Sequence, residues 1–288
     1  MAAGTTEFVD NTTADVFIPE LWSLEAIVAR DQRLIFAQDT VVNRIWEQNL
    51  TFGDTIHVPS RTHLSARTKS TNTAISYETQ TETNSDITIA THEYAAMAVE
   101  DITAKQANRD LFAFYAGELG YALDLSVDNV LAGLVDNFSQ VVGTLASELT
   151  YDELLRARQY LDDADAPEEM RNVVVSPAQE SGMMKLDHFI NRDYSDSTGV
   201  TQGMTGNRAW FGTWLGMPVW KSTNVEGSNA AGHDNGVFQR EALALVMQIK
   251  PRFVSDYDID FLTDKVAAQH LFGTREMRDD HGVFARGA

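Results

Sequence analysis

The sequence has no cysteine, few cations and no long apolar run, and each shortage excludes a class of function. Without cysteine, there are no disulfides, no thiolate nucleophiles and no Cys-ligated zinc or iron–sulfur sites. Lys and Arg number 22 against 42 Asp and Glu, a formal net charge of −20. Such an acidic balance argues against a protein that binds nucleic acid or anionic membranes through basic residues. The longest apolar runs, such as 95–99 and 242–247, are far shorter than the ~20 residues of a membrane-spanning helix.

The signatures of common enzymes are also missing. The chain has no Walker-type phosphate loop, no Gly-x-Gly-x-x-Gly and no Gly-x-Ser-x-Gly, and no two of its seven histidines are four residues apart. Asp256, Asp258 and Asp260 match the first three ligand positions of an EF-hand loop, but Phe261 stands where glycine is needed and Ala267 where glutamate is needed. We therefore expect no enzyme activity, no cofactor and no metal site.

What remains is the composition of a globular protein. The 288 residues are 43% hydrophobic and 22% charged, which fits one large domain or two ordinary ones. Helical and strand-like segments are interspersed, so the sequence predicts an α+β fold.

Residues 48–100 combine strand-like pieces with a long polar interval, 65–84, that holds almost no large apolar side chain. The charge is divided between the two arms of this segment. The first arm carries Arg61, Arg67 and Lys69 against Asp54 alone, and the second carries only acidic residues: Glu78, Glu82, Asp86, Glu93, Glu100 and Asp101. This division predicts a long hairpin whose tip projects from the core. A disordered loop remains the alternative.

Helical periodicity predicts two helices in the first half of the chain. A short one begins near Pro19, with an apolar stripe that reaches Ile35. A long one covers 105–137, with an apolar stripe of Phe112, Tyr115, Leu119, Leu123, Val130 and Leu134. The stripe leaves acidic residues off the buried face, namely Asp110, Glu118, Asp124 and Asp128.

The second half alternates between helix and strand. Thr150 and Glu153 form a capping box, Ser176-Pro177 opens another helix, and 173–175 reads as a buried strand. Two extended runs follow, 210–220 with a break at 216–218, and 238–249, which Pro251 is expected to end. Alternation over 266–272, a turn at 279–282 and a return strand from Val283 complete the chain.

The order of these parts resembles the major capsid proteins of tailed phages, the Hong Kong ninety-seven type of fold. Particular stretches resemble that family as well: 17–22 its arm-helix entry, 53–60 the strand that enters its extended loop, 100–107 the return into its spine helix, and 242–253 with 264–273 its C-terminal return. By this resemblance, 1–47 is an N-arm and 48–100 an extended loop. Residues 101–142 and 240–288 form a peripheral domain with a spine helix, and 143–239 form an axial domain.

The resemblance implies a coat protein that assembles with itself, as hexamers and pentamers, into an icosahedral head. The head encloses double-stranded DNA without sequence-specific binding and includes a portal protein. The expected location is the virion, with assembly in the host cytoplasm. Because the arm helix is expected to begin near Phe17, a separate scaffolding protein is expected as well.

We expect subunit contacts at Arg61, Arg67, Lys69, Glu78 and Glu82 of the extended loop and at Trp22 of the arm. The three basic residues would dock on acidic groups of an adjacent subunit. Two other functions stay open: the shell protein of an encapsulin-like nanocompartment, which has the same fold, and a soluble α/β enzyme.

Overall fold

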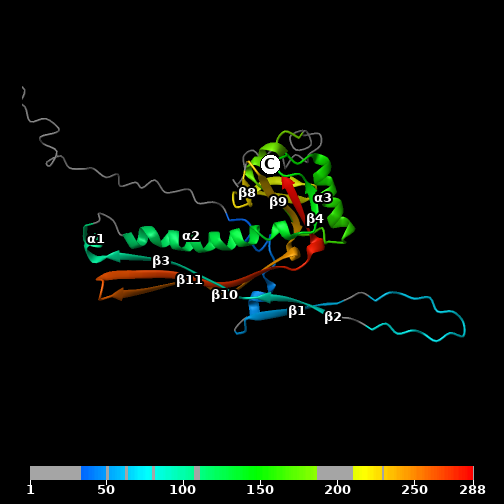
Figure 1. Ribbon diagram of the computed structural model, residues 1–288, viewed down its shortest axis with the longest axis horizontal. Coiled ribbons are helices and arrows are strands. Elements are labelled where there is room, and N and C mark those ends of the chain that lie inside the picture. The colour runs from blue at the N-terminus through cyan, green and yellow to red at the C-terminus, as the bar shows by residue number, and fades with distance from the viewer. Residues whose placement is uncertain are drawn as a thin grey trace, which may run out of the picture. The chain divides into compact units, whose positions relative to one another are not determined.

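The computed structural model describes residues 34–49, 52–61, 64–79, 82–106, 111–186, 210–228 and 230–287. Helices and strands are mixed in these residues, so the fold class is α+β (Figure 1). The strands form sheets of two, three and seven strands. The helix predicted from Pro19 and the contact residue Trp22 lie outside the described residues. Leu34 and Ile35, the end of that predicted stripe, lie in irregular chain.

The seven-stranded sheet has the order β4-β12-β9-β5-β7-β6, with β8 paired to β9. Pairing is parallel for β4 with β12 and for β5 with β7, and antiparallel elsewhere. Two helices belong to this part of the chain, α3 (Tyr151–Asp163) and α4 (Pro177–Met183). The strands are β4 (Gln140–Gly143), β5 (Arg171–Val175), β6 (Trp210–Trp214), β7 (Met217–Lys221), β8 (Gly227–Ser228), β9 (Gly232–Gln239) and β12 (Gly282–Gly287).

The local signals in this region are confirmed. The Thr150 hydroxyl accepts the Glu153 backbone N–H, and the Glu153 carboxylate accepts the Thr150 N–H, so the capping box opens α3. The Ser176 hydroxyl caps α4, with Pro177 as its first residue. α3 places Leu154, Ala157 and Leu161 in one core with Val173 and Val175 of the buried strand β5.

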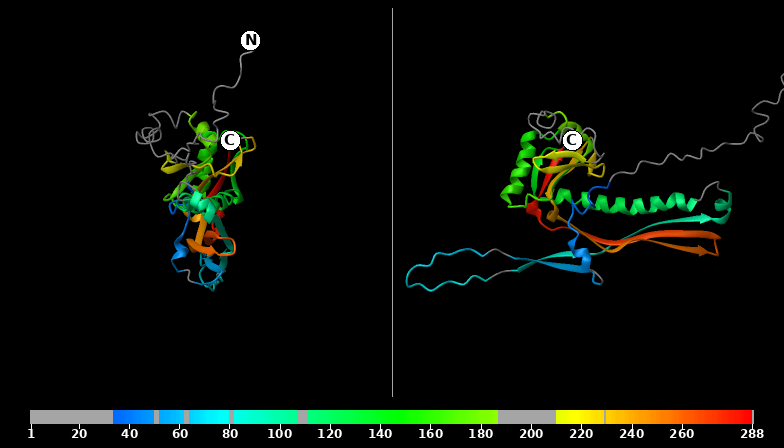
Figure 2. Two further views of the ribbon diagram at one scale, coloured as in Figure 1. Left: turned by 90° about the vertical axis from the view of Figure 1, so that its left-hand side faces the viewer. Right: turned by 180° about the vertical axis from the view of Figure 1, so that it is seen from behind.

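The three-stranded sheet pairs β3 (Thr91–Glu100) with β11 (Thr263–Glu276), and β11 with β10 (Leu243–Asp258), all antiparallel. Helix α2 (Leu111–Ala132) packs against it, with Leu119 and Leu123 contacting Ala268 of β11 (Figures 1 and 2). A short helix, α1 (Asp101–Gln106), directly follows β3. Three-residue 3₁₀ turns, η3 (Val135–Asn137), η4 (Arg240–Ala242) and η5 (Asp279–His281), connect this part to the seven-stranded sheet.

The predicted hairpin is confirmed. β1 (Thr55–Arg61) pairs antiparallel with β2 (Glu82–Thr88) in unbroken register, from Thr55 opposite Thr88 to Arg61 opposite Glu82. The intervening residues 64–79 are all exposed and belong to no strand, and Figures 1 and 2 show them as a loop that continues beyond the ladder.

Two expectations about the long helix are wrong. α2 ends at Ala132, before the predicted Asn137, and its buried face carries Val127 and Leu131, whereas Val130 is 37% exposed. The predicted stripe is correct at Leu119 and Leu123, but the buried face then continues through Val127 and Leu131 instead of Val130 and Leu134. This continuation brings Asp128 onto the buried face at 0% exposure. Residues 107–110 lie outside the described part of the chain.

Pro251 does not end its strand, contrary to the sequence-based expectation. β10 continues to Asp258, and its register with β11 shifts between Ile249 and Arg252, on either side of the proline. β10 is an edge strand of its sheet, so the missing N–H of proline costs no ladder hydrogen bond at a bulge there.

Candidate assembly interface

The loop between β1 and β2 holds three of the residues predicted to contact other subunits, Arg67, Lys69 and Glu78, and the strand ends that flank it hold Arg61 and Glu82. Arg67 lies 3.6 Å from the Glu78 carboxylate and donates to the Ser76 hydroxyl at 2.9 Å. Ser65 donates to Glu78 through its backbone N–H at 3.3 Å and its hydroxyl at 3.0 Å. The two arms are thus tied across the loop by exposed polar contacts, each worth at most about 1 kcal/mol.

The predicted contact residues are only partly brought together. Arg67 meets Glu78, and Arg61 stands opposite Glu82 in the ladder. Lys69 is exposed and, within the described part of the chain, has no carboxylate at ion-pair distance. Exposed apolar side chains accompany these charges: Leu64, Ile75 and Tyr77 are 63%, 56% and 88% exposed. The loop therefore presents both charge and apolar surface to its surroundings.

A second charged surface lies at the far end of the three-stranded sheet. We call it the acidic tip: Glu100, Asp101 and residues 256–265. It carries six carboxylates against one cation, Lys265. The Tyr257 hydroxyl donates to Asp101 at 2.8 Å, and the Asp101 N–H donates to the Leu262 carbonyl at 3.1 Å, so the turn and the end of β3 are joined.

An ion pair and a hydrogen bond within the turn between β10 and β11 position the Asp258 carboxylate of the acidic tip. Asp258 pairs with Lys265, which lowers the pKa of the Asp258 carboxyl, and it accepts the Asp260 N–H at 3.0 Å. No cluster of His, Asp and Glu among the described residues has a geometry that would hold a metal ion. The tip also exposes Ile259, Phe261 and Leu262 at 76%, 72% and 59%. The acidic tip therefore combines carboxylates with exposed apolar side chains. The loop between β1 and β2 combines the cations Arg67 and Lys69 with exposed apolar side chains.

Residues 34–49, which we call the strap, fasten the start of the described chain to the rest. Ile35, Phe36, Val41 and Val42 are at most 1% exposed and share a core with α2, β9 and β10. Phe36 stacks on Phe238 with ring centroids 6.4 Å apart. Burying four such side chains stabilises the attachment by roughly 6–12 kcal/mol before chain entropy is counted.

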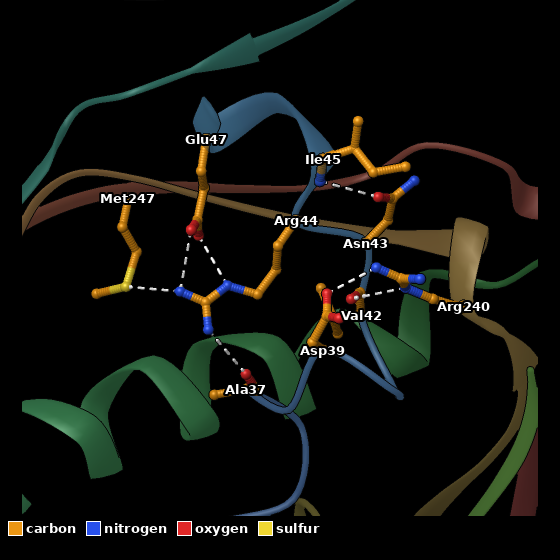
Figure 3. Close-up of polar contacts among 9 residues, drawn as sticks. All are labelled: Ala37, Asp39, Val42, Asn43, Arg44, Ile45, Glu47, Arg240 and Met247. Atoms are coloured by element: carbon orange, nitrogen blue, oxygen red, sulfur yellow. Dashed lines mark hydrogen bonds and ion pairs between the residues drawn. The ribbon is translucent and has the colours of Figure 1, made fainter. Parts of the chain in front are cut away.

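Polar contacts join the middle of the strap to β10 and η4, and others hold the strap in shape (Figure 3). The Asn43 N–H donates to the Leu243 carbonyl at 3.0 Å, and the Leu245 N–H donates to the Asn43 carbonyl at 3.1 Å. Asn43 thereby adds a parallel bridge to β10. Arg240 pairs with Asp39 at 2.6 Å, and Arg44 pairs with Glu47 at 2.8 Å.

Asp128 lies where α2 meets the strap. Helical periodicity predicted that this residue lies off the buried face of its helix, whereas the structure buries it completely. Its carboxylate accepts the Ala37 N–H at 3.1 Å and the Asn224 side-chain N–H at 2.7 Å. Position 128 follows Val127 and is three residues before Leu131. A stripe drawn through those two residues, instead of Val130 and Leu134, would have placed Asp128 on the buried face.

The arrangement of these elements matches solved structures over almost the whole chain. A structure from Mycobacterium phage Che8 superposes with a TM-score of 0.79 at 24% identity, covering 93% of this chain and 97% of that one. The capsid structure of cyanophage P-SCSP1u gives 0.74 at 18% identity, covering 100% and 99%, and the mature capsid of bacteriophage PhiM1 gives 0.71 at 13%, covering 99% and 97%. The fold is that of a tailed-phage capsid protein.

The capsid fold confirms the resemblance seen in the sequence. No family model matches the sequence, and no curated protein matches it. At identities of 13–24% the similarity concerns the backbone fold and not individual side chains. The side chains of the loop, the acidic tip and the strap are therefore particular to this chain. Among the residues that the structure describes, no helix has the length and hydrophobicity of a membrane span.

Proposed function

We propose that the chain is the major capsid protein of a tailed double-stranded DNA phage and assembles as hexamers and pentamers into an icosahedral head. The observation that supports this most is the match to phage capsid structures over nearly the full length of both chains. In this proposal, 1–47 is the N-arm, 48–100 the extended loop, 101–142 with 240–288 the peripheral domain, and 143–239 the axial domain. Assembly takes place in the host cytoplasm with a separate scaffolding protein and a portal protein.

Purification of the expressed chain, followed by size-exclusion chromatography and negative-stain electron microscopy, tests the proposal. Closed shells the size of a phage head, in the presence of scaffolding protein, are the expected result. Shells that hold an enzyme cargo and no genome would instead favour the encapsulin-like nanocompartment. A particle that stays monomeric under every assembly condition would favour a soluble α/β protein.

The loop and the acidic tip suggest how copies of the chain interact. The loop has the cations Arg67 and Lys69 and exposed apolar side chains, and the tip has an excess of carboxylates and exposed apolar side chains. Opposite charge steers association and sets the register of an interface. In the proposed shell, the loop of one subunit lies on acidic groups of a neighbouring subunit, and the tip is the strongest candidate surface of the described residues.

Reversing the charge of the loop tests this contact. The triple variant Arg61→Glu, Arg67→Glu and Lys69→Glu should remain folded by circular dichroism, because residues 64–79 contribute nothing to a buried core and Arg61 is the last residue of β1. It should form no shells, because like charges then face each other. The double variant Arg156→Glu and Lys185→Glu, on α3 and next to α4, is a control for negative charge added elsewhere on the surface and should still assemble. Normal shells from the triple variant would contradict the proposed contact.

A further inference from the structure

Asp128 is a fully buried carboxylate where three parts of the chain meet. It lies in the last turns of α2 and is 0% exposed. One carboxylate oxygen accepts the Ala37 N–H of the strap at 3.1 Å. The other accepts the amide N–H of Asn224, in the turn that follows β7, at 2.7 Å. A single side chain therefore joins the helix, the strap and the turn.

The groups that contact this carboxylate are neutral. Its hydrogen bonds come from an amide side chain and from the strap backbone. Residues close in the chain to Asp128, Ala37 and Asn224 belong to one apolar core: Ile35, Phe36, Val127, Leu131 and Val225. A buried carboxylate with no counter-ion is costly unless hydrogen bonds compensate for the lost hydration.

The charged groups on the packed elements are engaged with other partners. On the strap, Arg44 pairs with Glu47, and Asp39 pairs with Arg240. On α2, Asp124 is exposed and interacts with His270 and Arg44. Beyond the turn, burial and then the nearby Glu226 carboxylate raise the pKa of the Asp234 carboxyl. The protonation state of Asp128 therefore depends mainly on burial and on its own hydrogen bonds.

We propose that Asp128 and Asn224 form a proton-coupled lock on the strap. In the ionised state, the carboxylate accepts from Ala37 and from the Asn224 N–H. In the protonated state, the carboxyl group keeps the Ala37 hydrogen bond and donates its own proton to the Asn224 carbonyl oxygen, after that amide has turned over. In both states the Asp128 and Asn224 side chains are hydrogen-bonded to each other, because the amide of an Asn side chain has both a donor and an acceptor. Only the ionised state buries a charge.

The direction of the effect follows from this difference. Burial raises the pKa of the Asp128 carboxyl above its ordinary value of 3.8, while hydrogen bonds from Asn224 and from the backbone at 35–37 oppose the rise. A folded-state pKa above the unfolded-state value means that the folded chain binds the proton more readily. The stability that Asp128 contributes to the strap is therefore fully present below pH 3.8 and is lost as the pH rises through the raised pKa.

The variant Asp128→Asn keeps the shape and removes the charge at every pH. Compared with the wild type at pH 7, it should raise the thermal unfolding midpoint of the full chain by about 2–4 °C, and this gain should vanish near pH 4. Hydrogen exchange, compared between the two proteins at the same pH, should show slower exchange of residues 34–43 in the variant at pH 7 and equal exchange near pH 4. Asp39→Asn is the matched control, because it removes an exposed strap carboxylate paired with Arg240 and should give no gain at pH 7.

A second variant keeps the proposal testable if Asp128→Asn does not fold. Asn224→Ala removes the amide that supports both states, so the ionised carboxylate loses a donor in a water-poor site. Its loss of thermal midpoint should be larger at pH 7 than at pH 4. A loss of equal size at both values, or an Asp128→Asn variant destabilised equally at both, would show an ordinary structural hydrogen bond and would overturn the proposed lock.

Discussion

His281 is a buried imidazole whose protonation opposes folding. Burial lowers the pKa of His281 below its ordinary value of 6.5, Arg278 and Arg171 lower it further, and Asp280 and Glu241 act against them. The folded chain therefore prefers the neutral ring. The sign of its effect is opposite to that of Asp128, because the neutral form of histidine is the deprotonated one. The stability that neutral His281 contributes is present above pH 6.5 and is lost as the pH falls through the lowered pKa.

The variant His281→Gln should therefore flatten the dependence of stability on pH. Glutamine stays neutral, so the decrease in thermal midpoint between pH 7 and pH 5 should be smaller than in the wild type. Thermal unfolding followed by circular dichroism at several pH values measures this difference. His92→Gln, at an exposed position of β3, should leave the decrease unchanged. An equal decrease in the wild type and in His281→Gln would show that other groups carry the acid sensitivity.

Two glycines at the ends of elements have the same backbone conformation but different surroundings. Gly143 ends β4 with φ of +77°, and a Cβ there would lie 2.2 Å from the Arg286 carbonyl oxygen and 2.5 Å from a Leu149 methyl carbon. Gly216 lies in the turn between β6 and β7 with φ of +83°, and nothing lies within 4 Å of its Cβ position. Replacing each glycine by alanine separates backbone strain from steric overlap.

Gly216→Ala should cost about 1–2 kcal/mol in the free energy of unfolding, the cost of a left-handed conformation in an L-residue. Gly143→Ala should cost about 1–3 kcal/mol more, because the new methyl group also displaces the β12 backbone or Leu149. Urea unfolding monitored by tryptophan fluorescence gives both values. Equal costs for the two variants would mean that β12 shifts freely to accept the methyl group.

Local signals in the sequence predicted the elements that depend on local chemistry. The capping box at Thr150, the cap at Ser176 and the hairpin with divided charges could be predicted, because each depends on residues close together in the chain or on a simple pattern. The fold class also followed from the order of such elements.

Elements that depend on distant partners were less predictable. The last turns of α2 share a core with the strap, about ninety residues earlier in the chain, and periodicity alone chose Val130 over Val127 there. The continuation of β10 through Pro251 depends on its place at the edge of its sheet, which only the pairing with β11 reveals. The buried environment of Asp128 could not be predicted for the same reason.

At the scale of the whole molecule, the excess of acidic residues predicts that a shell of this protein has little affinity for the DNA that it encloses. A net charge of −20 repels the phosphate backbone, so packaged DNA would not adhere to the protein. We expect the purified chain to show no salt-dependent binding to duplex DNA. Fluorescence anisotropy with a labelled duplex at 50 mM and 150 mM salt measures this, and submicromolar affinity at 150 mM salt would contradict the expectation.

The strap can be buried only late in the synthesis of the chain, because its partners lie far along the sequence. Its residue Asp39 pairs with Arg240, 201 residues later, and its apolar side chains need β9 and β10 to be covered. At translation rates of about 5–20 residues per second, those partners emerge roughly 10–40 s after the strap. For that interval Phe36, Val41 and Val42 have no completed core to enter. The apolar side chains of the strap therefore stay uncovered until the last third of the chain has left the ribosome.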